Sequence, residues 1–580
     1  MTLSVTIYYD GDCPFCDRYA RLLKLQESAG TVYLRNLREH DEARHWLEQQ
    51  GFDLDEGMVV ELDGRRLAGA DAVHALALLS TPSGVFNRLN RVLLGSPILS
   101  SFIYPLLRAG RWLVLFLLGR TGFVAQDAGI QARTALFAQF FALFSFFHFF
   151  NYALEYGRFP PGVDLLVLLA AAVALFFRPR SARLLWLLMF TSTVSAIVQA
   201  PAHSNHTLMR NILLIGYWLS FGLTWSRTGD RQEIFRRFAP AGQGVLLVMY
   251  VFGIFHKLNS DFLNPVTSCA VALWRQMPLP LRLLDGTLVD YMTIYGTFVA
   301  EGALIVMLLS RRLRYLGICG GILFHMLLAL SGYAMYITFT MLSIAMHTLF
   351  LGNEAALAIV RSEEMKVIRS RLRDPLYLLA LLVLVAVMAL AAANGANSLV
   401  TLLMLPVVLP FCWLVVRYGR TNESLVAGDS ILSMRSVGLV TTLLLFVNCL
   451  LPYLGLKSAQ AINMFANLRL EAGVSNHLIM PVPGPFHYLE KVAIIEDAGT
   501  DNVLLSYLHN GHAIVYYDLL ARLETLPDNT VSFTLDGDRF DQVRASDFKD
   551  DISTVLHPRW FRKWFHFQPV MLTEPEACNV

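Results

Sequence analysis

Two cysteines near the start of the chain have the spacing of a redox pair. Cys13 and Cys16 stand in the run Asp10-Gly11-Asp12-Cys13-Pro14-Phe15-Cys16, which follows a β-branched and aromatic stretch. This order predicts a strand that leads into a helix, with Cys13 at the helix N-terminus, where backbone amides and the helix dipole favour a thiolate. We therefore predict that Cys13 is the nucleophile and that Cys16 resolves a mixed disulfide. The alternative is half of a zinc knuckle, but the N-terminal segment lacks a second ligand pair.

A second set of reactive residues lies in the apolar part of the chain. Lys257 ends a long apolar run, and the polar stretch His203-Ser204-Asn205-His206 precedes another. A lysine shielded from bulk water loses proton affinity and can act as a base, while a nearby histidine can orient or stabilise an anion. Because consecutive spans with a short connection usually pack together, Lys257 and His206 are predicted to face one cavity. A lysine that only snorkels to the membrane surface is the competing interpretation.

One carboxylate lies inside a further apolar run. Glu301 stands ten residues after Tyr291, which begins that run. A buried carboxylate in a membrane span marks a proton or substrate path, or it is paired with Arg or His or held neutral between helices. His148, His325 and His347 have no partner at metal-ligand spacing on a helix, so the sequence predicts no metal site.

Composition indicates a membrane protein with soluble ends. Hydrophobic residues make up 55% of the 580 residues and charged residues only 16%, whereas soluble domains carry roughly 25% charge. The 47 Lys and Arg residues nearly balance the 45 Asp and Glu residues, so no basic surplus is available and nucleic acid is not an expected partner. Seven cysteines in a chain of this length are too few for a secreted disulfide scaffold.

The elements that must position the cysteines form a predicted α/β domain over residues 1–82. Strand and helix patterns alternate along it. The predicted strands are 5–9, 31–34, 58–62 and 65–67, and the predicted helices are 17–26, 41–50 and 70–79. Strand, CxxC, helix and strand follow one another in the order of a thioredoxin-like domain.

These residues resemble a known family. Tyr9-Asp10-Gly11, Cys13, Cys16 and the later Gly69-Ala70-Asp71-Ala72 are similar to the DCC family of thiol-disulfide oxidoreductases, named for an Asp-x-x-Cys-x-x-Cys signature. The resemblance covers about residues 1–120. It implies a thioredoxin-like fold and protein-disulfide reductase activity, with Asp10, Cys13 and Cys16 in the catalytic motif and a protein thiol or disulfide as substrate.

Residues 134–456 are predicted to form a polytopic helical membrane domain. Runs nearly free of charge, each near the 20 or so residues that a span needs, give about eleven spans. They are 134–154, 165–177, 184–202, 211–226, 238–255, 291–310, two within 315–353, two within 375–416, and 436–456. Residues 83–133 are expected to be a linker with an interfacial anchor helix. Residues 457–580 are expected to be a small β-rich extracytoplasmic domain, with strands at 492–496, 503–508, 513–517 and 531–535 and turns at 510–511 and 536–537.

The loops between the spans predict an orientation. Arginines follow every even-numbered span, and by the positive-inside rule this places the N-terminus in the cytoplasm and the C-terminus outside. No export signal precedes the first domain. The expected location is the cytoplasmic (inner) membrane of a bacterium, with the lipid bilayer as a partner.

The membrane region also resembles a known family. The run Gly253-Ile254-Phe255-His256-Lys257-Leu258-Asn259-Ser260-Asp261, the pattern Asn205-His206-Thr207 and Phe324-His325 look like the HTTM region shared with vitamin K-dependent gamma-carboxylase, over about residues 130–480. The resemblance implies that Lys257 is a base that activates a reduced quinone, with His206 also catalytic. Asn205, His256, Glu301 and His325 are then candidate quinone-binding or substrate-binding residues, and a quinone is the candidate cofactor.

Three functions remain open from the sequence. The first is a membrane-bound thiol-disulfide oxidoreductase coupled to a gamma-carboxylase-like membrane domain. The second is a quinol-dependent carboxylase or oxygenase centred on Lys257 and His206, with the thiol domain as an accessory. The third is a membrane scaffold or transporter in which the CxxC pair only senses redox state.

Overall fold

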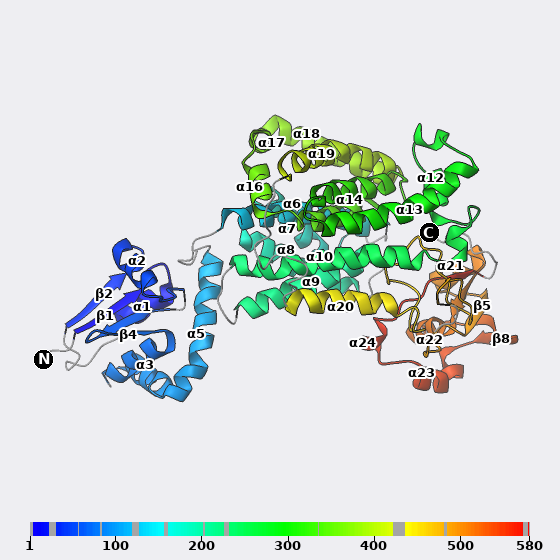
Figure 1. The fold of residues 1–580 in the computed structure, drawn as a ribbon. Coiled ribbons are helices and arrows are strands. Elements are labelled where there is room, and N and C mark those ends of the chain that lie inside the picture. Colours follow the sequence, from blue (N-terminus) through cyan, green and yellow to red (C-terminus); the bar gives the residue numbers. More distant parts are fainter. Residues whose placement is uncertain are drawn as a thin grey trace. The chain divides into compact units, whose positions relative to one another are not determined.

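The computed structural model describes residues 4–22, 31–55, 57–81, 84–118, 127–155, 161–200, 204–225, 231–333, 336–420, 436–480, 484–571 and Cys578. The chain divides into two compact units (Figure 1). Unit 1 comprises residues 1–127 and 218–235, and unit 2 comprises residues 128–217 and 236–580.

A four-stranded sheet organises the N-terminal part of unit 1. Its strands are β1 (Ser4–Tyr9), β2 (Thr31–Asn36), β3 (Val59–Leu62) and β4 (Arg65–Ala68), in the order β2-β1-β3-β4. β1 and β2 are parallel, and the other pairs are antiparallel. Val5 and Ile7 alternate toward the core, as the β-branched pattern requires. The predicted strands and hairpin are confirmed.

Five helices accompany this sheet. They are α1 (Pro14–Leu22), α2 (Asp41–Gln49), α3 (Gly69–Leu79), α4 (Val85–Leu94) and α5 (Pro97–Leu118). The predicted helix at 17–26 therefore begins three residues earlier, and its residues 23–26 lie outside the described part of the chain. α4 and α5 occupy the segment for which the sequence predicts a linker and an interfacial anchor, and both pack on α3.

Helices dominate the middle of the chain, and each predicted span coincides with one. They are α6 (Ala128–Phe150), followed by the π-helical turn η2 (Asn151–Glu155), α7 (Val163–Phe177), α8 (Ala182–Gln199), α9 (Asn205–Trp225), α10 (Arg231–His256), α11 (Ser260–Leu263), α12 (Cys269–Arg275), η3 (Leu281–Leu283), α13 (Thr287–Leu309), α14 (Arg314–Ala329), α15 (Tyr336–Thr348), α16 (Asn353–Arg361), α17 (Glu363–Arg371), α18 (Pro375–Ala393), α19 (Asn397–Tyr418) and α20 (Ser436–Leu450). The predicted breaks within 315–353 and 375–416 are confirmed by the ends of α14 and α18.

Six of the described helices are long and apolar enough to cross a membrane, or up to eight if each of two bent helix pairs counts as one span. α7, α14 and α20 are apolar but have only 15, 16 and 15 residues. The chain is compatible with a membrane protein, and the count of eleven spans is not confirmed.

The C-terminal part of unit 2 is a five-stranded sheet with helices packed on it. The strands β5 (Val492–Asp497), β6 (His512–Val515), β7 (Val531–Leu535), β8 (Asp538–Val543) and β9 (Val570–Met571) have the order β8-β7-β5-β6-β9. The helices are α21 (Asn502–Asn510), α22 (Tyr516–Thr525), η5 (Ala545–Phe548), α23 (Lys549–Val555) and α24 (Arg559–Arg562). Figure 1 shows this sheet at one end of the helices of unit 2.

One predicted C-terminal strand is wrong. Residues 503–508 form α21, because the Asp501 side chain accepts hydrogen bonds from the amides of Val503 and Leu504 and so caps a helix. Gly511, expected in a hairpin turn, instead ends that helix in the left-handed conformation, with a φ of 66°. The three leucines of this run, Leu504, Leu505 and Leu508, also favour a helix.

Candidate active sites

The CxxC pair lies at the start of α1. The peptide N–H of Cys13 donates to the carbonyl of Asp10 at 3.1 Å, which closes the turn between β1 and the helix. The carbonyl of Cys13 accepts from the amide of Asp17 at 3.0 Å, and the Cys13 sulfur lies 3.4 Å from the amide nitrogen of Cys16. The sulfur therefore faces the unpaired amides of the first helical turn, as the sequence predicts.

This placement shifts the pKa values of the two thiols in opposite directions. A hydrogen bond from the Cys16 thiol lowers the pKa of Cys13 to about 6, with help from the Cys16 and Phe15 amides and the Arg111 charge and against the effect of burial. The same hydrogen bond, together with burial, raises the pKa of Cys16 well above its ordinary value. At neutral pH Cys13 is a thiolate and Cys16 a thiol, the division of roles that disulfide exchange needs.

Asp10 is held between two arginines. Its Oδ1 accepts from Arg38 Nε and its Oδ2 from Arg111 Nη2, both at 2.8 Å, and its side chain is 1% exposed. Arg111 also donates to the carbonyl of Asp55 at 2.7 Å. Asp10 thus positions the Arg111 guanidinium, whose charge acts on both thiols.

In the sequence, Arg111 only interrupts the apolar run 92–118, which is expected to be the interfacial anchor helix. The signal that was available is the cost of burying arginine in an apolar helix, which requires a carboxylate partner. Asp10, 101 residues away, is that partner.

Loss of Arg111 is expected to raise the Cys13 pKa, because the thiolate loses a nearby positive charge. In Arg111→Gln, the rate of Cys13 alkylation should reach half of its plateau at a higher pH than in the wild type. Arg38→Gln is the matched control, since Arg38 also binds Asp10 but does not contribute to the Cys13 shift. Equal profiles for Arg111→Gln and the wild type would contradict the role of Arg111.

Both sulfurs are covered. Cys13 is 0% and Cys16 8% exposed, and they share a core cluster with Met58, Leu94 and Leu115. The last two belong to α4 and α5, so a disulfide substrate reaches Cys13 only if this cover shifts.

A second candidate site is a cavity of about 560 Å³ inside the helical part of unit 2. Its wall is largely apolar and includes Phe262, Phe339 and Phe465. Lys257 Nζ donates to Glu301 Oε1 at 2.6 Å in this wall, and the two residues are 9% and 6% exposed. Glu301 is therefore a paired carboxylate, but its partner is a lysine and not the Arg or His named from the sequence.

A chain of polar side chains continues from this cavity. Tyr250 and His325 line it, and the Tyr250 hydroxyl lies 3.0 Å from His325 Nε2 and 3.2 Å from His347 Nε2. Glu301 Oε2 and His325 Nδ1 are buried and have no hydrogen-bond partner among the described residues. An occupant of the cavity with both a donor and an acceptor would satisfy them.

The other predicted site residues lie elsewhere. His256 binds the Tyr453 hydroxyl through Nδ1 at 2.7 Å and the carbonyl of Ala461 through Nε2 at 2.8 Å. Asn205 Oδ1 accepts from the amide of Ile462 at 3.0 Å. Both side chains tie helix ends to the segment after α20, and neither is among the described residues that line the cavity.

His206 does not join Lys257 at the cavity, which corrects the prediction of one shared site. Its Nε2 lies 3.3 Å from Ser204 Oγ, and its ring packs against His148 and Phe144. The N-terminus of α9 and the end of α10 both bind the segment after α20, through Asn205 at Ile462 and His256 at Ala461, but the His206 ring contacts α6 and not the cavity. His203 lies outside the described residues.

Within the described ranges, no group of three or more His, Cys, Asp or Glu residues is arranged to bind a metal.

Residues 7–115 match the family model of the DCC1-like thiol-disulfide oxidoreductases. The matched range begins in β1, includes the CxxC pair and extends through Arg111 on α5, and it supports a redox function for the N-terminal part of the chain. No curated protein and no solved structure matches the chain. The resemblance of the membrane region to gamma-carboxylase is not confirmed by these comparisons.

Proposed function

We propose that the N-terminal part of the chain is a thioredoxin-like thiol-disulfide oxidoreductase that acts on protein disulfides. The observation that carries the proposal is the Cys13 sulfur at the first turn of α1, with its pKa lowered to about 6 and a protonated Cys16 beside it. The family match over residues 7–115 supports the same function.

The exchange follows from these two protonation states. The Cys13 thiolate attacks one sulfur of the substrate disulfide, and the other substrate sulfur leaves as a thiolate. Cys16 then loses its proton and attacks Cys13 Sγ, which releases the second substrate thiolate and leaves a Cys13–Cys16 disulfide. The substrate has gained two electrons, and an external dithiol must reduce the domain again.

A turnover assay tests this proposal. The purified full chain should accelerate the reduction of a disulfide-bonded model protein by a dithiol, and the rate should saturate with the model protein. A rate equal to that of the dithiol alone, with Cys13 reduced and the protein folded, would contradict it.

The membrane orientation is proposed from the basic loops. A disulfide between Cys269, at the start of α12, and Cys578 supports it, because both residues fall on the predicted outer side and stable disulfides belong to oxidising compartments.

Compartment-sensitive reporters fused to the two ends of the full chain should therefore give opposite signals. The N-terminal reporter should show the cytoplasmic signal and the C-terminal reporter the outer one. Equal signals from both ends would mean an even number of spans and would overturn this orientation.

A second candidate function is base catalysis in the membrane cavity, of the kind implied by the gamma-carboxylase resemblance. The Lys257–Glu301 pair in an apolar cavity favours it, because the resemblance assigns the role of the base to Lys257 and the Glu301 carboxylate lies within hydrogen-bond reach of Lys257 Nζ.

A lipid-soluble quinol fits this cavity by size and polarity. The aromatic wall accommodates a ring, and the unpaired Glu301 Oε2 and His325 Nδ1 are available to its polar oxygens. When bound, a quinol supplies two electrons and two protons. Lys257 would take a proton at Nζ, and Tyr250 would orient His325 by its hydrogen bond to Nε2. Quantifying any quinone that copurifies with the protein tests this candidate.

A further inference from the structure

A buried arginine in the helical part of unit 2 has no counter-charge among the residues that the structure describes. Arg210, on α9, is 1% exposed and is the largest fully buried side chain. Its Nε donates to Asn211 Oδ1 at 3.1 Å, and its Nη1 lies 2.6 Å from His148 Nε2. Neither partner is acidic, and no carboxylate in the described ranges pairs with Arg210. A buried charge without a partner is costly.

The surroundings of Arg210 do not neutralise it. Because Nη1 of Arg210 donates to His148 Nε2, the imidazole is neutral and carries its proton on Nδ1, and this nitrogen is buried with no partner in the described part of the chain. Gln199 approaches the same Nε2 with its Oε1 at 3.1 Å, which adds no negative charge. Arg210 Nη2 has no acceptor among the described residues, so part of the guanidinium fork is available to a ligand.

The same helix connects Arg210 to a large polar pocket. His206 precedes Arg210 by four residues and lies on the same face of α9. Its ring is 6.1 Å from that of His148, and its Nε2 is 3.3 Å from Ser204 Oγ. Ser204 and Asn205 line a pocket of about 950 Å³ between α9, the segment after α20 and the C-terminal sheet region. The side chains of His206 and His148 therefore form a chain of contacts that links this pocket to Arg210.

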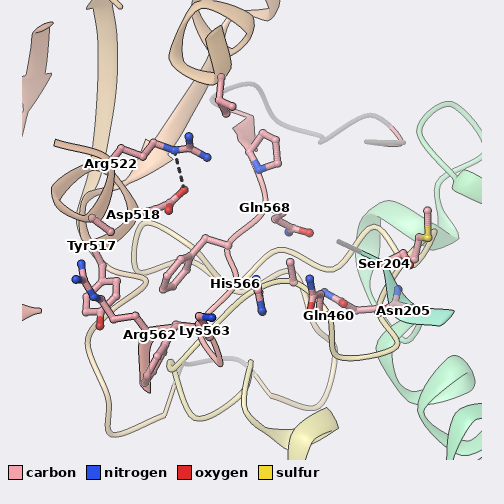
Figure 2. Close-up of a pocket in the computed structure, with 18 of the residues that line it drawn as sticks. Ser204, Asn205, Gln460, Tyr517, Asp518, Arg522, Arg562, Lys563, His566 and Gln568 are labelled. Carbon is pink, nitrogen blue, oxygen red and sulfur yellow. Dashed lines mark ion pairs between the residues drawn. The ribbon is translucent and has the colours of Figure 1, made fainter. Parts of the chain in front are cut away.

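The pocket carries an excess of positive charge. Its lining includes four cations and two carboxylates, namely Arg522, Arg559, Arg562 and Lys563 against Asp518 and Glu524. Figure 2 shows Arg522, Arg562 and Lys563 across the pocket from Ser204 and Asn205. Arg522 pairs with Asp518 and Asp501, and Glu524 pairs with Arg559 and Arg562, whereas Lys563 has no acidic partner among the described residues. Such a lining attracts anions.

We propose that Arg210 binds a small carboxylate-like anion inside the helical domain and that the polar pocket is its entrance. The anion supplies the missing negative charge. The two oxygens of a carboxylate match the planar donor geometry of the guanidinium better than a point charge does. A single guanidinium without other charges selects a monovalent ligand, and the fully buried position selects a small one.

Formate is the probe, and thermal unfolding of the full chain in detergent is the measurement. Sodium formate replaces sodium gluconate at constant ionic strength, because gluconate is too large for a buried site. The midpoint of unfolding should rise with formate concentration and saturate, as it does when a ligand binds only the folded state. A wild-type midpoint that does not change with formate would overturn the proposal.

Variants test whether the response to formate depends on Arg210. Arg210→Gln should weaken formate binding by about tenfold or more, as expected when a charged hydrogen-bond partner is lost. Its midpoint in gluconate should be no lower than that of the wild type, because the buried charge is gone. A formate response equal to that of the wild type, or a midpoint lowered by the same amount in both salts, would show a purely structural role and contradict the proposal.

Two further variants complete the design. Arg133→Gln is the matched control, since Arg133 is also buried but binds Asn353 Oδ1 and the carbonyl of Leu349, and it should keep the wild-type affinity for formate. Arg210→Lys keeps the charge without the planar fork, so it should bind formate more weakly than the wild type and still respond. Arg210→Lys also tests the proposal if Arg210→Gln does not fold. An affinity of Arg210→Lys for formate equal to that of the wild type would contradict recognition by the planar guanidinium.

Discussion

Replacing Cys13 with serine is expected to abolish thiol-disulfide exchange by this protein. Cys13 is the one member of the pair that is a thiolate at neutral pH, and a serine hydroxyl cannot replace a sulfur nucleophile. The rate of disulfide reduction should fall to that of the dithiol alone, with the unfolding midpoint nearly unchanged because the two side chains have similar volume. Turnover of a model disulfide by the full chain is the measurement.

Cys16→Ser is the matched control for this experiment. It leaves the nucleophile and removes the resolving thiol, so the first step should proceed and stop at a mixed disulfide between Cys13 and the substrate. A trapped complex in Cys16→Ser but not in Cys13→Ser is expected. Trapping through Cys16 instead would reverse the roles.

The second large effect concerns the buried ion pair of Lys257 and Glu301 in the cavity of the helical part of unit 2. Lys257→Met leaves Glu301 buried without its cation, and loss of one partner of a buried pair typically costs about 3–5 kcal/mol of unfolding free energy. The double variant Lys257→Met with Glu301→Leu removes both charges and should recover most of this loss. Unfolding of the three variants by denaturant is the measurement. Additive losses would mean that the two side chains do not interact.

The variant Lys257→Arg distinguishes the role of Lys257 as the cation of the ion pair from its proposed role as a base. Arginine retains the positive charge beside Glu301 and should preserve much of the stability, but it stays protonated and cannot act as a base. Consumption of an added short-chain quinol should therefore be lost in this variant if the cavity performs base catalysis. A quinol-consuming Lys257→Arg would reduce Lys257 to a structural cation.

The sequence predicts the CxxC site well because its determinants are local. β1, the turn that follows it and α1 all lie within residues 4–22, and the alternation of side chains and the turn residues predict their conformations directly. The hairpin of β3 and β4 is local in the same way. Arg111 was missed because only the tertiary fold brings α5 to Asp10.

The membrane site was predicted in part. Lys257 and Glu301 were each recognised from the cost of burying charge, but their pairing across 44 residues depends on how α10 and α13 pack, which a single sequence does not contain. His206 was misplaced for the same reason. Arg210 was overlooked because one arginine at the edge of an apolar run looks like the end of a span.

Titration of the two thiols tests the central claim, that Cys13 is the low-pKa nucleophile, most directly. The reduced wild-type chain is alkylated over a range of pH values, and mass spectrometry follows Cys13 and Cys16 separately. Cys13 should react at half of its maximal rate near pH 6 and slow roughly tenfold for each pH unit below that, as its thiolate is protonated. Cys16 should react only at much higher pH. A lower midpoint for Cys16 than for Cys13 would contradict the account.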